Sequence, residues 1–270
     1  MSDNARLAPS PHVVADVLPV PRRVPFDAPW AWLAAGWRDL WTIPGISLTY
    51  GFVFAATALA LSLGLWRMQA HSLFLALAGG FLLIGPLVAV GLYEASRRLQ
   101  LGDKLKLSDV VAAGMGARGQ LAFFGIVLLF TLMVWLQLAF LLLMMFLGNA
   151  GLPPASAFVQ TLLFTPRGLG LLIVGSLVGG IIAATVFAIS VVAVPLLLVS
   201  RTDAVTAARA SIDAVVANPK PMMLWAALIV VIMGAGFVTM LIGLAVAFPL
   251  VGHATWHAYC DIYGTPASAK

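Results

Sequence analysis

Long runs without a charged side chain decide what this chain can fold into. Five stretches contain no Asp, Glu, Lys or Arg, namely 46–66, 72–93, 121–147, 169–199 and 222–260. A helix needs about 20 apolar residues to cross the ~30 Å hydrocarbon layer of a bilayer, and each stretch reaches that length. We therefore predict an all-α protein, a polytopic bundle of membrane helices.

The composition supports this prediction and excludes other classes. Charged residues make up 9% of the 270 residues and hydrophobic residues 62%, against roughly 25% and 45–50% in soluble domains. A soluble domain is excluded, and nucleic-acid binding is not expected. The single cysteine, Cys260, allows no intrachain disulfide. Residues 1–25 contain five prolines and are predicted to be a disordered cytoplasmic tail, followed by a membrane domain (26–264) and a C-terminal tail (265–270).

The last uncharged stretch is too long for one span. As one helix, residues 222–260 would extend about 58 Å at 1.5 Å per residue, nearly twice the hydrocarbon thickness. We favour two spans, 222–239 and 242–260, which gives six in total. One span that continues into a long helix outside the bilayer, five in total, is the alternative.

An internal repeat favours six spans. Three times the sequence shows a short amphipathic segment, a span, and a second span with a proline in its later half: Pro86, Pro195 and Pro249. We therefore expect three tandem hairpins, each preceded by a cytoplasmic interfacial helix. The prolines are predicted kink sites, because each leaves a carbonyl without its helical donor. The kinks could serve packing alone, which we favour, or form a hinge or polar pocket.

Aromatic residues are placed as membrane anchors. In the amphipathic segment 26–44, Trp30, Trp37 and Trp41 recur at helical spacing. Trp256 and Tyr259 lie near the end of the last predicted span. Indole and phenol rings favour the membrane–water interface, so these five residues are predicted interfacial anchors.

The distribution of basic residues predicts the orientation. With six spans and a cytoplasmic N-terminus, only Arg67 and Arg167 of the 15 Lys and Arg residues lie outside. Cytoplasmic loops are enriched in Lys and Arg, so we expect both termini in the cytoplasm. A five-span count gives almost the same asymmetry and does not decide the number.

Four stretches carry a resemblance to a known family. They are GWRDLWTIPG, GPLVAVGLYEASRRLQLGD, ISVVAVPLLLVSRTDAVTAARASIDAVVANPKPMMLW and PLVGHATWHAY, which together span about 30–259. They resemble a family of bacterial integral membrane proteins with a domain of unknown function, some of whose members carry the name of cytochrome c oxidase subunits. The resemblance implies a multi-pass protein of the bacterial inner membrane, with a respiratory terminal oxidase as a partner. In that family a basic residue commonly follows the last tyrosine, whereas Cys260 follows Tyr259 here. This difference weakens the prediction that the C-terminus is cytoplasmic.

Two histidines are the main chemical lead. His253 and His257 are four residues apart, a spacing by which one helix can supply two ligands to zinc, copper or haem iron. The motif HATWH lacks the glutamate of HExxH peptidases. Copper or haem would suit an oxidase connection. The alternative, which we favour, is an interfacial belt in which His253 hydrogen-bonds a neighbouring span.

Glu94 is a carboxylate that directly follows a predicted span, and the repeat aligns it with His257. A Glu94–His257 pair is one hypothesis, because ionisable groups at membrane depth usually pair. The ordinary alternative, which we favour, is an ion pair between Glu94 and Arg98 at i, i+4.

Three functions remain open. No predicted span contains an ionised side chain, and the chain has no phosphate-binding loop or hydrolase triad, so an enzyme is not favoured. The first hypothesis is a non-catalytic accessory or assembly component of a membrane complex. The second is a carrier or lipid-handling protein for an uncharged or amphipathic molecule, which predicts a cavity between the second, fourth and sixth spans. The third is a metal- or haem-binding redox protein that uses His253 and His257.

Overall fold

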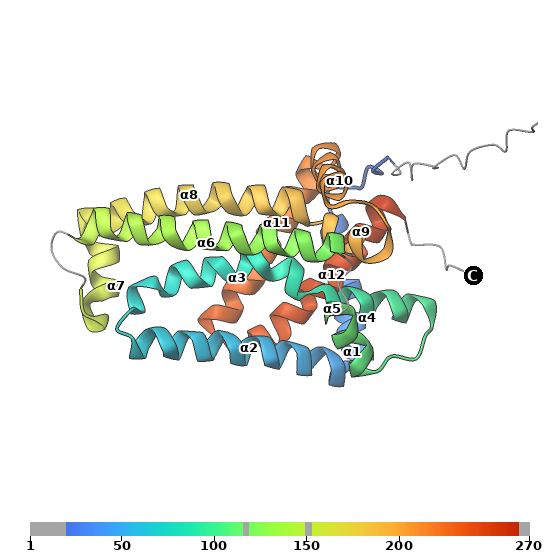
Figure 1. The fold of residues 1–270 in the computed structure, drawn as a ribbon, viewed down its shortest axis with the longest axis horizontal. Coiled ribbons are helices and arrows are strands. Elements are labelled where there is room, and N and C mark those ends of the chain that lie inside the picture. Colours follow the sequence, from blue (N-terminus) through green and yellow to red (C-terminus); the bar gives the residue numbers. More distant parts are fainter. Residues whose placement is uncertain (1–19, 116–118, 149–152, 265–270) are drawn as a thin grey trace, which may run out of the picture.

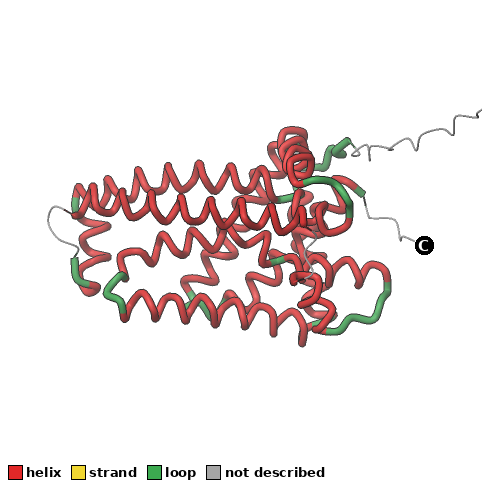
Figure 2. The backbone as a smooth tube through the Cα atoms, viewed as in Figure 1, coloured by secondary structure: helices red, strands yellow, loops and turns green. Residues whose placement is uncertain are grey.

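The computed structural model describes residues 20–115, 119–148 and 153–264. Within these ranges every regular element is a helix (Figure 2), which confirms the all-α prediction. Residues 1–19 and 265–270 lie outside the described ranges, and with them most of the predicted tails. The helices are α1 (Ala28–Thr42), α2 (Pro44–Arg67), the short 3₁₀ helix η1 (His71–Leu73), α3 (Phe74–Val88), α4 (Val90–Leu101), α5 (Leu107–Met115), α6 (Gly119–Leu147), α7 (Ala155–Phe164), α8 (Pro166–Ser190), α9 (Ala193–Val199), α10 (Ala204–Ala217), α11 (Pro219–Val238) and α12 (Leu244–Tyr263).

Five helical segments of the described residues are long and apolar enough to cross a membrane. They are Pro44–Arg67, His71–Val88, Gly119–Leu147, Pro166–Val199 and Pro219–Val238. These segments correspond to the first five predicted spans, with ends shifted by up to five residues. The protein is therefore a polytopic helical membrane bundle.

The sixth predicted span, 242–260, forms a helix but is not among those five segments. As expected, residues 222–260 fall into two helices, which a turn at 239–243 separates. The second of them, α12, contains two histidines and Asp261, and most of its residues are buried against α1, α2, α4 and α11. The alternative count of five spans therefore matches the number of strongly apolar segments. Helix α12 is buried in the core of the protein.

The long helices run side by side along the molecule, with α7 across one end and α1, α4, α5, α9 and α10 gathered at the other (Figure 1). The three expected interfacial segments are the helices α1, α5 and α10, which all lie at this second end. The backbone N–H of Arg22 donates to the carbonyl of Ile262 at 2.9 Å. The first and last described segments are therefore held together at the same end.

The predicted hairpins do not pack as three equal pairs. Helices α6 and α8 pack against each other, as do α11 and α12, whereas α2 packs mainly against α12 and α3 against α6. The Phe248 ring of α12 stacks on the Phe54 ring of α2, with 3.8 Å between the ring centroids. The Phe54 ring also meets the Phe81 ring of α3 edge-on, with 5.2 Å between the centroids. Helix α12 therefore links the first and third hairpins.

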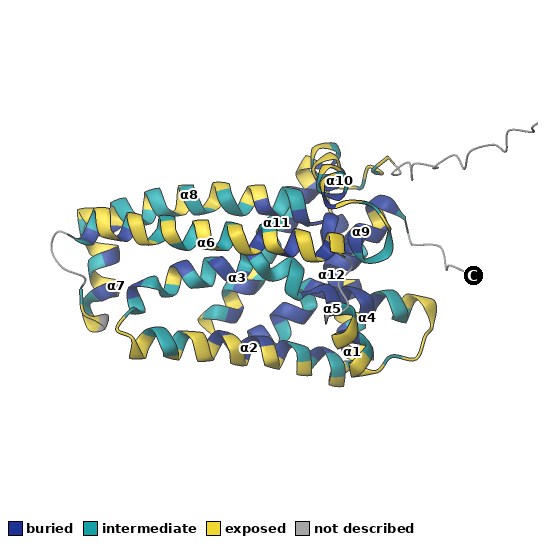
Figure 3. Cartoon of the chain, viewed as in Figure 1, coloured by how far each residue is buried: buried dark blue, intermediate teal, exposed yellow. Residues whose placement is uncertain are grey.

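Burial is distributed unevenly along the molecule. Buried residues concentrate where α12 meets α1 and α4, while the outer faces of α2, α6 and α8 are largely exposed (Figure 3). The exposed side chains there are apolar, with Phe130, Met133 and Ile181 each more than 60% exposed. An apolar surface of this extent is suited to contact with the lipid bilayer.

Close packing of α2 on α12 depends on a glycine. A Cβ atom added at Gly51 would lie 2.0 Å from the carbonyl oxygen of Ala245 and 2.9 Å from the Pro249 ring. Small residues at such positions allow membrane helices to approach closely. Pro249 also leaves that same carbonyl without its usual helical donor, because proline has no N–H.

The three predicted kink prolines lie in different settings. Pro86 is inside α3, which ends two residues later at a break before α4. Pro195 is inside α9, after the break at 191–192 that separates it from α8. Pro249 lies inside α12, which continues as one helix to Tyr263. The helix is therefore interrupted near two of the prolines and runs on past the third.

Candidate functional site

His253 is the centre of a buried polar cluster. Its side chain is fully buried. Ser47 of α2 contacts Nε2 through its Oγ atom at 2.9 Å, and Ser96 of α4 contacts Nδ1 through its Oγ atom at 2.8 Å. Three helices thus converge on one imidazole.

The hydrogen bonds fix which nitrogen carries the proton. Ser96 donates its hydroxyl hydrogen to Oδ2 of Asp39 at 2.6 Å, so its oxygen must accept from His253. His253 is therefore protonated at Nδ1, and its Nε2 accepts from Ser47. The ring is a neutral imidazole with both nitrogens occupied.

The cluster continues along α12 to Gln100 of α4. Trp256 donates its indole N–H to Oε1 of Gln100 at 3.0 Å, which turns the amide nitrogen of Gln100 towards Nδ1 of His257 at 3.4 Å. On its other side His257 donates from Nε2 to Oδ2 of Asp39 at 2.8 Å. Asp39 thus accepts from both a serine and a histidine, so the cluster is fully paired.

Charges in the cluster follow from this pairing. Burial would by itself raise the pKa of Asp39, but hydrogen bonds from His257 and Ser96 outweigh it and lower that pKa below its ordinary value. Burial lowers the pKa of His253 to about 4, although the Asp39 charge acts in the opposite sense. At neutral pH, Asp39 is ionised and His253 is neutral.

As placed, His253 does not offer a lone pair to a metal ion or to haem iron. A ligand nitrogen must offer a lone pair, and the lone pair of His253 already accepts from Ser47. Across the described ranges, no group of three or more His, Cys, Asp or Glu side chains could hold a metal ion. The geometry supports the alternative in which His253 hydrogen-bonds neighbouring helices.

The proposed Glu94–His257 pair does not form. The carboxylate of Glu94 binds Arg97 and Arg98, in each case at 2.7 Å, while His257 binds Asp39. Burial acts to raise the pKa of Glu94, but the hydrogen bonds from the two arginines lower it. Arginines three and four residues away are within reach on the same helix, so the i, i+4 alternative is correct.

The predicted anchors divide into two groups. Trp30, Trp37 and Trp41 of α1 are 55%, 47% and 50% exposed, as an interfacial position requires. Trp256 and Tyr259 are buried in the core, and their assignment as interfacial anchors is wrong. They lie on α12, which α1, α2 and α4 enclose, so their rings pack inside the protein.

Several cluster residues had no sequence signal of their own. Ser47, Ser96 and Gln100 are common residue types, and each contacts α12 across more than 150 positions. One signal was available: Ser96 and Gln100 are four residues apart, like His253 and His257, and the two pairs face each other. Within the resembling stretches, the asparagine of VVANP, Asn218, holds the backbone of residues 22–24 through its amide.

A second feature is an apolar groove between α3, α8, α11 and α12. It has a volume of about 690 Å³, and its walls include Pro86 of α3, Gly180 of α8, Met222 of α11 and Phe248 of α12. No charged side chain lines it, and its polar side chains are Tyr93, Ser190 and Thr255. The cavity expected between the second, fourth and sixth predicted spans is therefore present, with α11 as a further wall.

The groove is open along one side. The α11 residues Met223, Val230 and Val231 line it and are 73%, 58% and 66% exposed. Both α8 and α11 belong to the membrane-spanning segments. The opening therefore faces the hydrocarbon layer.

Comparison with known proteins adds a family match. Residues 73–199 match the family model described as Predicted integral membrane protein (DUF2189). The match covers α3 to α9, which include two walls of the groove, and is narrower than the resemblance over 30–259. No curated protein and no solved structure matches the chain. The comparisons thus support an integral membrane protein and assign it no function.

Proposed function

We propose that the protein is a lipid-handling membrane protein that holds the hydrocarbon part of an uncharged or amphipathic lipid in the groove. The observation that carries this proposal is a cavity of about 690 Å³ between three membrane-spanning segments and α12, with exposed apolar residues of α11 along its open side. Ligand pockets in proteins commonly have volumes of about 300–1,000 Å³. A groove of this size takes one extended chain.

The chemistry of the walls selects hydrocarbon. Ordered water needs two to four polar partners, and the lining offers few. An empty groove would lose dispersion contacts on every wall. The lining also contains no charged group to neutralise an ionised headgroup. A neutral chain that enters sideways from the bilayer satisfies all of these conditions.

A groove-filling variant tests the proposal. Gly180 lines the groove, and a Cβ atom added there would meet no atom within 4 Å. Gly175 on the same helix has equally open space around it but does not line the groove. Gly180→Leu should lower the amount of lipid that co-purifies in mild detergent, while Gly175→Leu should leave it unchanged. Mass spectrometry of lipid extracted from the purified protein measures the ratio.

The matched glycines make the result decisive. Lipid that merely coats the outer surface would be retained equally by the wild type and both variants, and this outcome would contradict the proposal. Loss in Gly180→Leu alone, with an unchanged melting temperature, would support a lipid bound in the groove.

A place in a membrane complex, such as one with a respiratory oxidase, stays a prediction from the resemblance. The exposed apolar faces of α2, α6 and α8 are suited equally to lipid and to a partner helix. A partner that remains bound at native expression after gentle solubilisation would support it.

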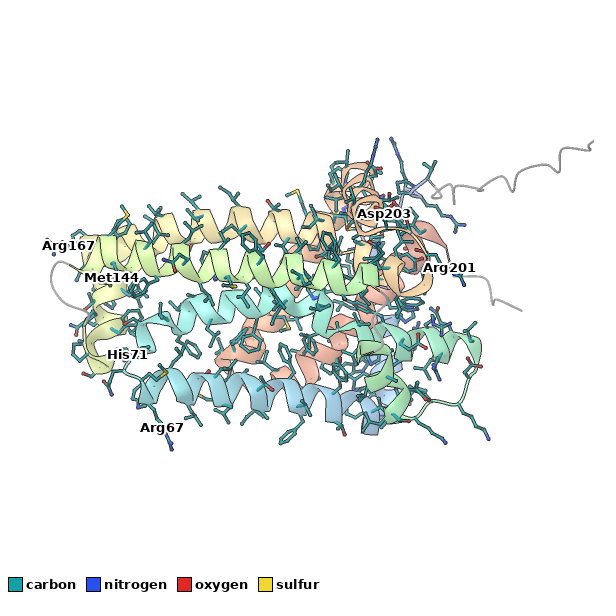
Figure 4. All side chains as sticks on the ribbon, in the orientation of Figure 1. Arg67, His71, Met144, Arg167, Arg201 and Asp203 are labelled. Carbon is teal, nitrogen blue, oxygen red and sulfur yellow. The ribbon has the colours of Figure 1, made fainter. Side chains whose placement is uncertain are left out.

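We also propose that the end formed by α1, α4, α5 and α10 faces the cytoplasm of a bacterial inner membrane. Arg67 and Arg167 lie at the α7 end, and Arg201 lies at the opposite end (Figure 4). The remaining described Lys and Arg residues belong to segments of the Arg201 end, as the positive-inside rule requires.

Cysteine labelling of intact cells tests this orientation. In a Cys260→Ser background, Arg67→Cys should react with a membrane-impermeant maleimide, and Lys104→Cys should react only after lysis. Both positions are exposed, so access to the reagent depends on the side of the membrane. The reverse pattern would overturn the orientation.

A further inference from the structure

The groove contains three polar side chains, and two of them are already paired. Ser190 donates to the carbonyl of Val186 at 2.6 Å, and Thr255 donates to that of Val251 at 2.8 Å. Such bonds to the preceding helical turn are usual for Ser and Thr in helices. Neither hydroxyl has a hydrogen left for a ligand.

The third, Tyr93, is different. Its side chain lines the groove at the start of α4 and is 2% exposed. Within the described residues its hydroxyl has no hydrogen-bond partner. Burial raises the pKa of Tyr93, so the hydroxyl keeps its hydrogen. Buried tyrosine hydroxyls usually find a hydrogen-bond partner.

Other unpaired polar atoms do not point to the groove. Ser72 Oγ and Trp225 Nε1 are buried without a partner, but neither residue lines the groove. Tyr50, which lies near Tyr93, donates its hydroxyl to the carbonyl of Val88. Tyr93 therefore provides the free donor of the groove.

We propose that the lipid held in the groove is neutral and carries a carbonyl oxygen, which accepts a hydrogen bond from the Tyr93 hydroxyl. This inference rests on the proposed lipid-handling function and names the ligand class for the same groove. A carbonyl matches a lone donor, whereas a hydrocarbon would leave it unpaired. An ionised headgroup would enter a lining without a counter-charge, which is costly. The carbonyl belongs to an ester or to a ketone.

Three probes of equal chain length distinguish an ester, a ketone and a hydrocarbon as the ligand: methyl palmitate, a long-chain methyl ketone and octadecane. Each deuterated probe is equilibrated with delipidated full-length protein, and the bound fraction is measured by mass spectrometry. Tyr93→Phe should weaken binding of the ester or the ketone by about two- to tenfold, as expected for one hydrogen bond, and leave octadecane unchanged. If Tyr93→Phe weakens the binding of one carbonyl probe more than that of the other, this difference shows whether the carbonyl belongs to an ester or to a ketone.

A matched control isolates the hydroxyl. Tyr263 is also buried, and its hydroxyl donates to the carbonyl of Ala210 at 2.8 Å, away from the groove lining. Tyr263→Phe should leave all three affinities unchanged. In the wild type, the infrared carbonyl band of the bound carbonyl probe should lie lower than in Tyr93→Phe, and this second readout requires no change in affinity.

The outcomes separate the two proposals. Equal weakening of all three probes in Tyr93→Phe, or no weakening and no band shift, would overturn the carbonyl inference while the groove remains a lipid site. If no probe binds the wild type, or if Gly180→Leu binds all three as well as the wild type does, the lipid-handling function itself fails.

Discussion

Two faces of α12 have opposite chemistry. Both follow the i, i+3, i+4, i+7 spacing of a helical stripe. One stripe lines the apolar groove and comprises Phe248, Val251, Gly252 and Thr255. The other enters the polar cluster and comprises His253, Trp256, His257 and Cys260.

This difference separates stability from binding. In the cluster, each polar partner of His253 is satisfied, so a change there leaves buried groups unpaired. In the groove, the walls stand apart and one donor is free, so a change there alters what can bind. Substitutions should therefore have large effects on stability on one side of α12 and small ones on the other.

The largest effect is expected where α12 touches α2. In Gly51→Val, the new Cβ would lie 2.0 Å from a backbone oxygen of α12, which cannot move unless the helices separate. We expect loss of the monodisperse folded protein in size-exclusion chromatography. Gly64→Val, on the same helix with no atom within 4 Å of its Cβ, should behave like the wild type. Similar behaviour of the two variants would show that α2 and α12 do not pack closely.

The next largest effect is expected at His253. His253→Ala removes a fully buried ring, leaves the Ser47 hydroxyl without its acceptor and removes the hydrogen bond that Ser96 accepts. Two hydrogen bonds and a cavity imply a loss of about 2–4 kcal/mol, which is a drop of roughly 10 °C in melting temperature for a protein of this size. Gln at this position keeps a donor and an acceptor, so His253→Gln should lose less. If the two variants melt alike, hydrogen bonding by the imidazole is not what stabilises the cluster.

The local pattern of the sequence was enough for most of the fold. Uncharged runs and helical spacing are local properties, so they located five spans and the helices α1, α5 and α10. Hydropathy does not distinguish a face that meets lipid from one that meets protein, which is why Trp256 was expected at the membrane interface. The pairs Asp39–His257 and Ser47–His253 join residues more than 200 positions apart, and no periodicity reports such contacts.

Acid should weaken the polar cluster in a defined pH range. The ordinary pKa of histidine, 6.5, is lowered to about 4 at His253 by burial, so protons bind the unfolded chain more readily than the folded protein. The contribution of the neutral His253 to the free energy of unfolding is fully present above pH 6.5. It is lost as the pH falls towards 4, by at most roughly 3 kcal/mol. Melting temperatures measured between pH 7 and pH 4.5 test this.

The carboxylates of Asp39 and Glu94 do not obscure that range. The pKa values of Asp39 and Glu94 are lowered from 3.8 and 4.5, so their contributions persist until the pH falls below those values. In His253→Gln the slope between pH 6.5 and pH 4.5 should be smaller than in the wild type. An unchanged slope would assign the acid sensitivity to another group.

The smallest effect is a coupling that should be absent. Glu94 binds Arg97 and Arg98, whereas His257 binds Asp39, so the two residues have different partners. In a double-mutant cycle, Glu94→Gln and His257→Gln should add within about 0.5 kcal/mol in thermal stability, and Glu94→Gln with Arg98→Gln should deviate by about 0.5 kcal/mol or more. Coupling of Glu94 to His257 that matches its coupling to Arg98 would mean that the α4 carboxylate reaches the polar stripe of α12. The network would then extend from the cluster to the arginines, and its two parts could no longer be treated as independent.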